Sequence, residues 1–135
     1  MISKDGIRPA VGYVYPRFTF TGVGLNSSIA DLVKWELALA EGRVLRPATL
    51  AEAAHPFRLG DGKDGQFGLS WMSGLRNGHP TMQFGGGAAV WHLRLPDDHL
   101  SVIVLTNLQG SGAEALSMGV AQIYVPELNT ATGKQ

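Results

Sequence analysis

Apolar residues recur at helical spacing in the first half of the chain. This spacing predicts a helix over residues 28–41, in which Ser28 or Ser27 caps the first turn and an acid about three residues later, Asp31, completes the capping motif. Gly42 ends the helix, because glycine readily adopts the left-handed conformation found at helix ends. Pro47 suits the first turn of a second, short helix.

After residue 65 the pattern changes to short runs of β-forming residues. These runs cover residues 66–73, 79–84, 88–95 and 100–106, with turn-forming Gly, Asn, Pro or Asp between them. Short connections join antiparallel strands, so the runs predict a meander. The last run is apolar almost throughout, which is typical of a strand covered on both faces.

A final apolar pattern predicts a closing helix that ends at Pro126. Its apolar residues share one helical face: Ala113, Leu116, Val120, Ile123 and Tyr124. The expected fold class is therefore α+β, an antiparallel sheet of three to four strands flanked by helices, with the carboxy-terminal helix packed on the sheet. Residues 1–26 are expected to form an irregular segment and residues 127–135 a flexible tail.

Composition restricts the class of protein and its partners. The chain has 135 residues, enough for one domain, and 44% of them are hydrophobic, which is typical of a globular protein. Its 11 basic residues balance its 11 acidic ones and are scattered singly, so no nucleic-acid partner is expected. Without cysteine, and with irregularly spaced histidines, the chain is expected to hold neither a metal nor a cofactor. No membrane span or signal peptide is recognisable, and the compartment stays open.

Several short motifs follow one another in an informative order. They are GVGLNSSIADL at residues 22–32, GRVLRPATL at 42–50, FGLSW at 67–71, LRLPD at 93–97 and VIVLTN at 102–107. Their succession resembles the serine β-lactamase and penicillin-binding-protein-like hydrolase family, in its class C-like, esterase-type branch. The resemblance implies that residues 27–126 form the carboxy-terminal part of a β-lactamase-like domain, a partial β-lactamase-like fold.

The resemblance also implies a set of catalytic motifs, two of which do not occur in this sequence. In the family, the serine of S-x-x-K is acylated, its lysine and the tyrosine of Y-x-N move protons, and K-T-G or H-x-G on a strand lines the pocket. The residues three positions before the four lysines are Met1, Asp31, Gly60 and Ala131, and those two positions after the three tyrosines are Tyr15, Arg17 and Pro126. A serine hydroxyl needs an adjacent base, so no catalytic residue is predicted here.

The third motif is predicted to survive as a remnant of the substrate pocket. Phe84, Gly85 and Gly86 stand where the resemblance places H-G-G-G or K-T-G, and phenylalanine cannot pair with a substrate carboxylate. Counting back without a gap from Pro96 places the motif at residues 81–83 instead, which restores no cation either. The glycines also have a plain interpretation as a hairpin connection that turns with positive φ, and the residues alone favour it.

Other residues with potential chemistry have simple structural interpretations. His92 shares a strand face with Val90 and Arg94 and is expected at the surface rather than as a base. Trp35, Trp71 and Trp91 are expected in the core or at a domain contact.

These patterns support two main functions. The first is a fragment of a serine hydrolase, inactive alone, whose complete family members act on β-lactams, D-Ala-D-Ala peptides or esters. The alternative is a non-catalytic binding or assembly domain derived from that fold, and an intact esterase with an unorthodox serine is less favoured. In relatives a strand from the amino-terminal half pairs with the last strand, so its edge is expected to be covered here by a homo-oligomer, by residues 7–20 or by a missing amino-terminal half.

Overall fold

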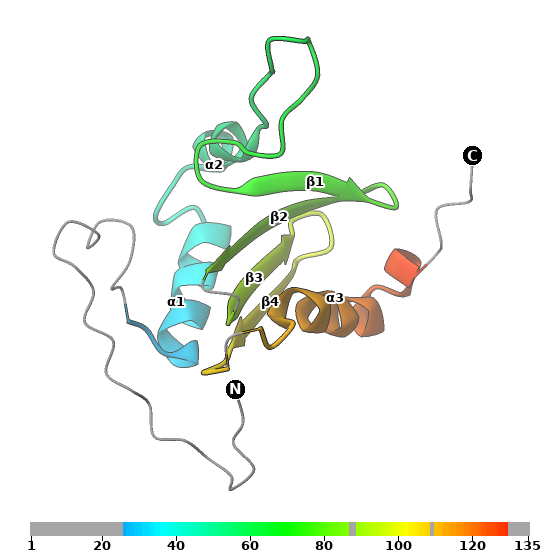
Figure 1. Cartoon of the computed structure of the whole chain (residues 1–135). Helices are drawn as coiled ribbons and strands as arrows, with labels where there is room; N and C mark the ends of the chain where they lie inside the picture. The colour runs from blue at the N-terminus through cyan, green and yellow to red at the C-terminus, as the bar shows by residue number, and fades with distance from the viewer. Residues whose placement is uncertain (1–25, 87–88, 109, 130–135) are drawn as a thin grey trace, which may run out of the picture.

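The computed structural model describes residues 26–86, 89–108 and 110–129. These residues form a four-stranded antiparallel sheet in the order β1-β2-β3-β4, with helices beside it (Figure 1). The elements are α1 (Ile29–Ala40), α2 (Pro47–Ala54), β1 (Met72–Arg76), β2 (His79–Gly86), β3 (Val90–Leu95), β4 (Leu100–Leu105), α3 (Ala113–Tyr124) and the 3-10 helix η2 (Pro126–Asn129). The expected α+β class, the meander and the closing helix are confirmed.

The two faces of the sheet have different chemistry. Leu93 pairs with Val102 across β3 and β4, and these apolar residues face α3. Arg94 pairs with Ser101 and points to the opposite face, because neighbouring residues of a strand alternate between faces. Glu36 of α1 contacts both Arg94 and Ser101, so α1 covers this second face. One face is therefore apolar and the other carries buried polar groups.

The apolar core lies between α3 and the strands β3 and β4. Leu93 and Leu95 are fully buried there, together with Val102 and Val104 of β4. Full burial of such a side chain contributes about 1.5–3 kcal/mol. This cluster is the main apolar contribution to stability in the described part of the chain.

The apolar face predicted for α3 is only partly right, because Ala113 of that set is buried and Val120 packs against the core, but the three largest residues are exposed. Leu116, Ile123 and Tyr124 are 53%, 75% and 71% exposed, whereas the residues buried against the sheet are Ala113, Ser117 and Ala121. The branched side chains of β3 and β4 already fill this space, so only small helix residues fit against them. The outward face of α3 is consequently apolar.

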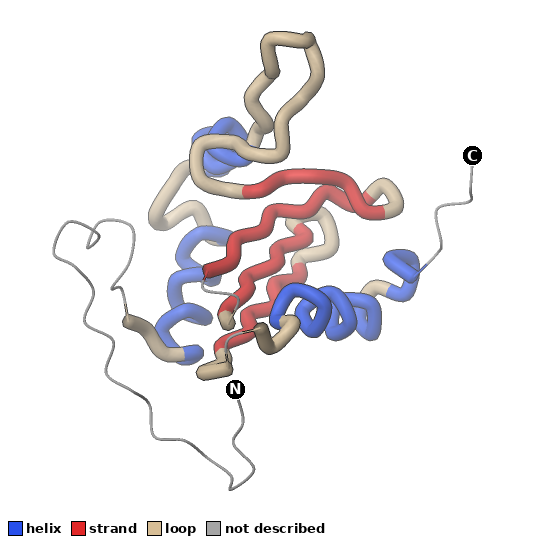
Figure 2. The backbone as a smooth tube through the Cα atoms, viewed as in Figure 1, coloured by secondary structure: helices blue, strands red, loops and turns tan. Residues whose placement is uncertain are grey.

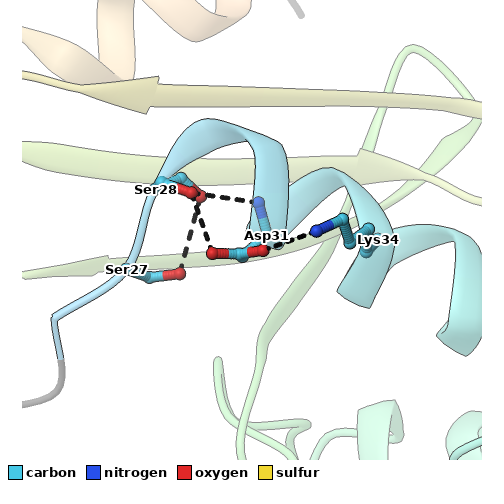
Figure 3. Close-up of polar contacts among 4 residues, drawn as sticks. All are labelled: Ser27, Ser28, Asp31 and Lys34. Atoms are coloured by element: carbon cyan, nitrogen blue, oxygen red, sulfur yellow. Dashed lines mark hydrogen bonds and ion pairs between the residues drawn. The ribbon is translucent and has the colours of Figure 1, made fainter.

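The start of α1 follows the prediction closely. The Ser28 hydroxyl accepts a hydrogen bond from the Asp31 amide at 3.2 Å and donates one to the Asp31 carboxylate at 3.0 Å (Figure 3). Lys34 pairs with the same carboxylate at 2.9 Å. Hydrogen bonds from Lys34 and Ser28 hold the pKa of Asp31 below its usual value. Gly42 follows the helix with φ of +71°, as expected for a residue that ends it.

The first predicted strand is displaced toward the carboxy terminus. The expected run was 66–73, whereas β1 is Met72–Arg76, and the preceding residues form a loop that projects beyond the sheet (Figure 2). This loop is held by its own backbone hydrogen bonds, including Phe57 N–H to Phe67 O at 2.9 Å. A Cβ at Gly68 would lie 2.4 Å from Ala53 O, so the chain here packs on the end of α2 instead of pairing in the sheet.

The prediction that the last strand is covered on both faces is only half right. Val102 and Val104 are buried under α3, while Ser101 and Leu105 on the other face are exposed. Of the three tryptophans expected in the core or a domain contact, Trp35 is about half exposed. Residues 7–20, the candidate cover for β4, lie outside the described residues.

Candidate functional site

Phe84, Gly85 and Gly86, the predicted pocket remnant, form the last part of β2. The pairing of β1 with β2 reaches only as far as Gln83, opposite Met72. Beyond that point β2 pairs with β3 alone among the described strands, up to Gly86 opposite Val90. The Phe84 side chain is 57% exposed. This end of β2 therefore presents an open backbone edge and an exposed aromatic ring.

Gly85 is required because the Trp91 ring packs against it, and not because the chain turns there with positive φ. Gly85 and Gly86 are strand residues, and neither has a positive φ, so the interpretation as a hairpin turn is wrong for these two. Gly85 pairs with Trp91, and a Cβ at Gly85 would lie 2.1 Å from Trp91 Cε3. The indole ring lies where a side chain would be, and only glycine leaves room for it.

A pocket of about 450 Å³ adjoins this end of β2. It is lined by Gly85, Gly86, Val90, Trp91, Gly110, Gly112, Ala113 and Glu114, which brings β2 and β3 next to the start of α3. The indole N–H of Trp91 is buried and has no hydrogen-bond partner within the described residues. Glu114 is the one ionisable side chain among these lining residues. The pocket thus offers an indole ring and glycine backbone, and its described lining residues include no nucleophile and no cation.

The alternative register of the pocket motif falls inside the sheet. Residues 81–83 lie in the middle of β2, where Thr81 and Met82 are buried. The structure therefore leaves the end of β2 as the more accessible of the two positions.

A second polar cluster lies on the opposite face of the sheet, beneath α1. Its centre is the Glu36 carboxylate, which accepts a hydrogen bond from the Ser101 hydroxyl at 2.5 Å. Arg94 Nε lies 3.0 Å and His92 Nε2 lies 3.3 Å from the same oxygen, Oε2. Neither nitrogen is aligned for a hydrogen bond; the Arg94 contact is an ion pair, and the His92 contact is one only when the imidazole is protonated. Trp71 closes the cluster, with its ring 5.6 Å from the His92 ring and 5.8 Å from the Arg94 guanidinium.

The electrostatics of this cluster keep Glu36 ionised. Burial raises the pKa of the Glu36 carboxyl, but contacts with His92 and Ser101 and the charges of His92 and Arg94 outweigh burial and lower the pKa overall. An ionised carboxylate with a lowered pKa is a weak base. The cluster therefore favours a structural and binding role over proton abstraction.

The prediction that His92 lies at the surface is wrong. Its side chain is only 18% exposed, and that of Arg94 is 7% exposed. The alternation of β3 correctly placed the two residues on one face. What the sequence did not reveal is that α1 supplies Glu36, about 60 residues earlier in the chain, to compensate their charge.

Within residues 26–86, 89–108 and 110–129, no group of three potential metal ligands comes together. In the same part of the chain, no helix has the length and apolar character needed to cross a membrane.

Comparison with known proteins agrees with this architecture. The sequence model of the beta-lactamase family matches residues 3–124. The D-aminopeptidase of Gluconobacter oxydans (strain 621H) is 26% identical to this chain over an alignment 135 residues long. The alignment covers 94% of this chain and 25% of that protein. The chain thus spans about a quarter of the length of this curated relative. No solved structure matches the chain significantly.

Replacing Gly85 by alanine is expected to lower the free energy of unfolding by about 1–3 kcal/mol, because the new Cβ overlaps the Trp91 ring. Gly86→Ala is the matched control, since its Cβ would lie 3.7 Å from Val90 Cγ2, an ordinary contact. Urea unfolding followed by tryptophan fluorescence measures both variants. Equal stabilities would contradict the close contact between Gly85 and Trp91.

Replacing Glu36 by alanine is expected to cost about 3–5 kcal/mol, because Arg94 is then left buried without its counter-charge. Replacing both residues by methionine is expected to cost much less, about 1 kcal/mol or below, since no charge remains buried. Arg43→Ala, which breaks an exposed pair with Glu41, serves as the control and is expected to change stability by less than about 0.5 kcal/mol. A double-mutant cycle that shows no coupling would contradict the ion pair.

The same cluster predicts a dependence on pH. Because the pKa of Glu36 is lower in the folded state than its ordinary value of 4.5, Glu36 stabilises the fold above that value. This contribution is lost as the pH falls through the lowered pKa. Acid titration of Glu36→Gln should show a shallower loss of stability below pH 4.5 than the unsubstituted chain. Identical acid profiles would show that Glu36 does not carry this contribution.

Proposed function

Because the chain belongs to the beta-lactamase family, we propose that it forms the carboxy-terminal part of an acyl-serine hydrolase domain and is inactive without the remainder of that domain. One observation carries the proposal. The sheet, the closing helix and the pocket at the end of β2 are present, whereas neither S-x-x-K nor Y-x-N occurs in the 135 residues. Under this proposal the chain contributes one wall of the active site, and the nucleophile and its bases come from protein outside these 135 residues.

The end of β2 supports a role in holding the substrate backbone. Phe84, Gly85 and Gly86 extend beyond the part of β2 that β1 covers, so backbone groups on this edge are free of strand pairing among the described residues. An extended substrate can pair with such an edge, as peptides do in strand addition. The glycines allow close approach, and the Trp91 ring lines the adjoining pocket.

The chemistry of this edge also bears on the substrate. The similar D-aminopeptidase suggests amides of D-amino acids, while the family as a whole includes β-lactams, D-Ala-D-Ala peptides and esters. Phe84 provides no positive charge for a substrate carboxylate. We therefore favour amide or ester substrates whose recognition at this edge does not depend on a free carboxylate.

A second candidate function is a non-catalytic binding or assembly domain. Two surfaces favour it: the outer edge of β4, which has no strand partner within the described residues, and the apolar outward face of α3. A sheet edge and an apolar patch are both common sites of association. They are equally compatible with coverage by a missing amino-terminal half, so the two functions differ in what covers them.

The absence of a nucleophile with its base predicts that the 135-residue chain forms no covalent adduct with a penicillin or a fluorophosphonate. Intact-mass spectrometry measures the adduct, and hydrolysis of D-alanine p-nitroanilide measures turnover. A stoichiometric adduct on one serine would overturn the proposal and favour an intact esterase. If an upstream segment of the same reading frame carries S-x-x-K and Y-x-N, adding that segment should restore both adduct and turnover; a frame without them favours the assembly domain.

Because no described residue covers the β4 edge or the outward face of α3, we expect the isolated chain to be a dimer or larger unless residues 7–20 cover the β4 edge. Sedimentation velocity measures its mass. Leu116→Glu combined with Ile123→Glu should abolish association if the α3 face is the contact, and should leave it unchanged if the contact is the β4 edge, because both residues are exposed. A monomer at all concentrations would contradict the prediction of self-association.

A further inference from the structure

The face of the sheet beneath α1 carries a row of side chains that crosses all four strands. Ser73 of β1 is opposite Met82 of β2, Met82 is opposite Arg94 of β3, and Arg94 is opposite Ser101 of β4. Glu36 of α1 reaches this row and pairs with Arg94. All five residues line one cleft of about 970 Å³ between α1, α2 and the sheet.

Besides Arg94 Nε, which contacts Glu36 only as an ion pair, three buried polar atoms of residues that line this cleft have no hydrogen-bond partner among the described residues. They are Glu36 Oε1, Arg94 Nη1 and Ser73 Oγ. The Glu36 and Arg94 side chains are only 9% and 7% exposed. Buried polar atoms are nearly always paired in folded proteins, and a charged group without its full set of partners is the more costly case. The cleft is therefore suited to a ligand that completes these bonds.

The arrangement restricts the charge of that ligand. A carboxylate would suit Arg94 but would be repelled by the ionised Glu36, and an ammonium group would be attracted by Glu36 but repelled by Arg94. A neutral amide satisfies both, because its carbonyl accepts from Arg94 and its N–H donates to Glu36. Ser73 can donate to or accept from the same group.

Most of the other lining residues are apolar, although His55, Asp64, Thr81 and His99 also line the cleft. Val33 and Leu37 of α1 and Leu75 of β1 line it and are about half or more exposed, and Leu50, Met82 and Ile103 also contribute. We propose that this cleft binds a peptide amide that carries an aliphatic side chain, at a site separate from the pocket at the end of β2. The peptide chain supplies both parts of this match, since each peptide unit is a neutral donor and acceptor next to a side chain.

Three matched probes test the proposal on the 135-residue chain. N-acetyl-leucinamide is neutral, N-acetyl-leucine carries a carboxylate and leucinamide carries an ammonium group, while all three share one side chain. Titration at neutral pH, followed by ¹⁵N NMR, is expected to shift the Arg94 side-chain signal and the backbone amides of Ser73 and Gly74. The neutral probe should bind about tenfold more tightly than either charged probe, the factor expected from one unmatched hydrogen bond to a charged group.

Glu36→Gln tests the origin of this selectivity. It removes the negative charge, so binding of N-acetyl-leucine should strengthen and binding of leucinamide should weaken. Glu52→Gln makes the same change at an exposed position of α2 that does not line the cleft, and should alter none of the three affinities. If Glu36→Gln does not fold, Ser73→Ala keeps both charges and should weaken the neutral probe without changing the order.

The proposal is overturned if the three probes bind with equal affinity, or if the order of their affinities is unchanged in folded Glu36→Gln. It is also overturned if no probe perturbs the signals of the cleft residues. Shifts confined to Gly85, Gly86 and Gly112 would do the same, because they would place the probe in the other pocket.

Discussion

The close fit between α3 and the strands β3 and β4 is the constraint on which the rest of the structure depends. Leu93 and Leu95 fill the sheet face, so the helix residues buried directly against it are small ones such as Ala121 and Ser117. Ser117 is fully buried, and its hydroxyl donates to the Glu114 carbonyl at 2.7 Å, so burial leaves this group satisfied. This fit fixes the rotation of α3 and thereby turns its large apolar residues outward.

Local sequence signals predicted most of the fold. The errors arose where the packing of residues distant in sequence determines which side chains are buried. The cap at Ser28 and the positive φ of Gly42 depend on a few neighbouring residues, which is why helix boundaries were predicted well. The buried face of α3 depends instead on how much space two distant strands leave. Hydrophobicity alone selected Leu116 and Ile123, whereas the available volume selected alanine and serine.

The candidate sites show the same division. The motif comparison located the end of β2, but the need for glycine comes from the ring of Trp91, which only the pairing of β2 with β3 brings to Gly85. The cluster around Glu36 was missed because its members are distant in sequence. Glu36 on the first helix gives no sign of a site in the sequence, and neither does the pair of His92 and Arg94 on one strand face. They form a cluster only because the register of the sheet and the position of α1 bring them together.

The two faces of the sheet are thus held by different interactions, apolar contacts on one and buried polar contacts on the other. On the α3 side, the apolar residues of β3 and β4 are buried, and the apolar residues left exposed lie on the outer surface of the helix. On the α1 side, a buried ion pair and further buried polar atoms without hydrogen-bond partners line a largely apolar cleft, so burial there creates a requirement that the described residues do not meet. These requirements, unmet within residues 26–86, 89–108 and 110–129, support our proposal that this member of the beta-lactamase family contributes one part of a hydrolase domain whose acylation motifs lie outside these 135 residues.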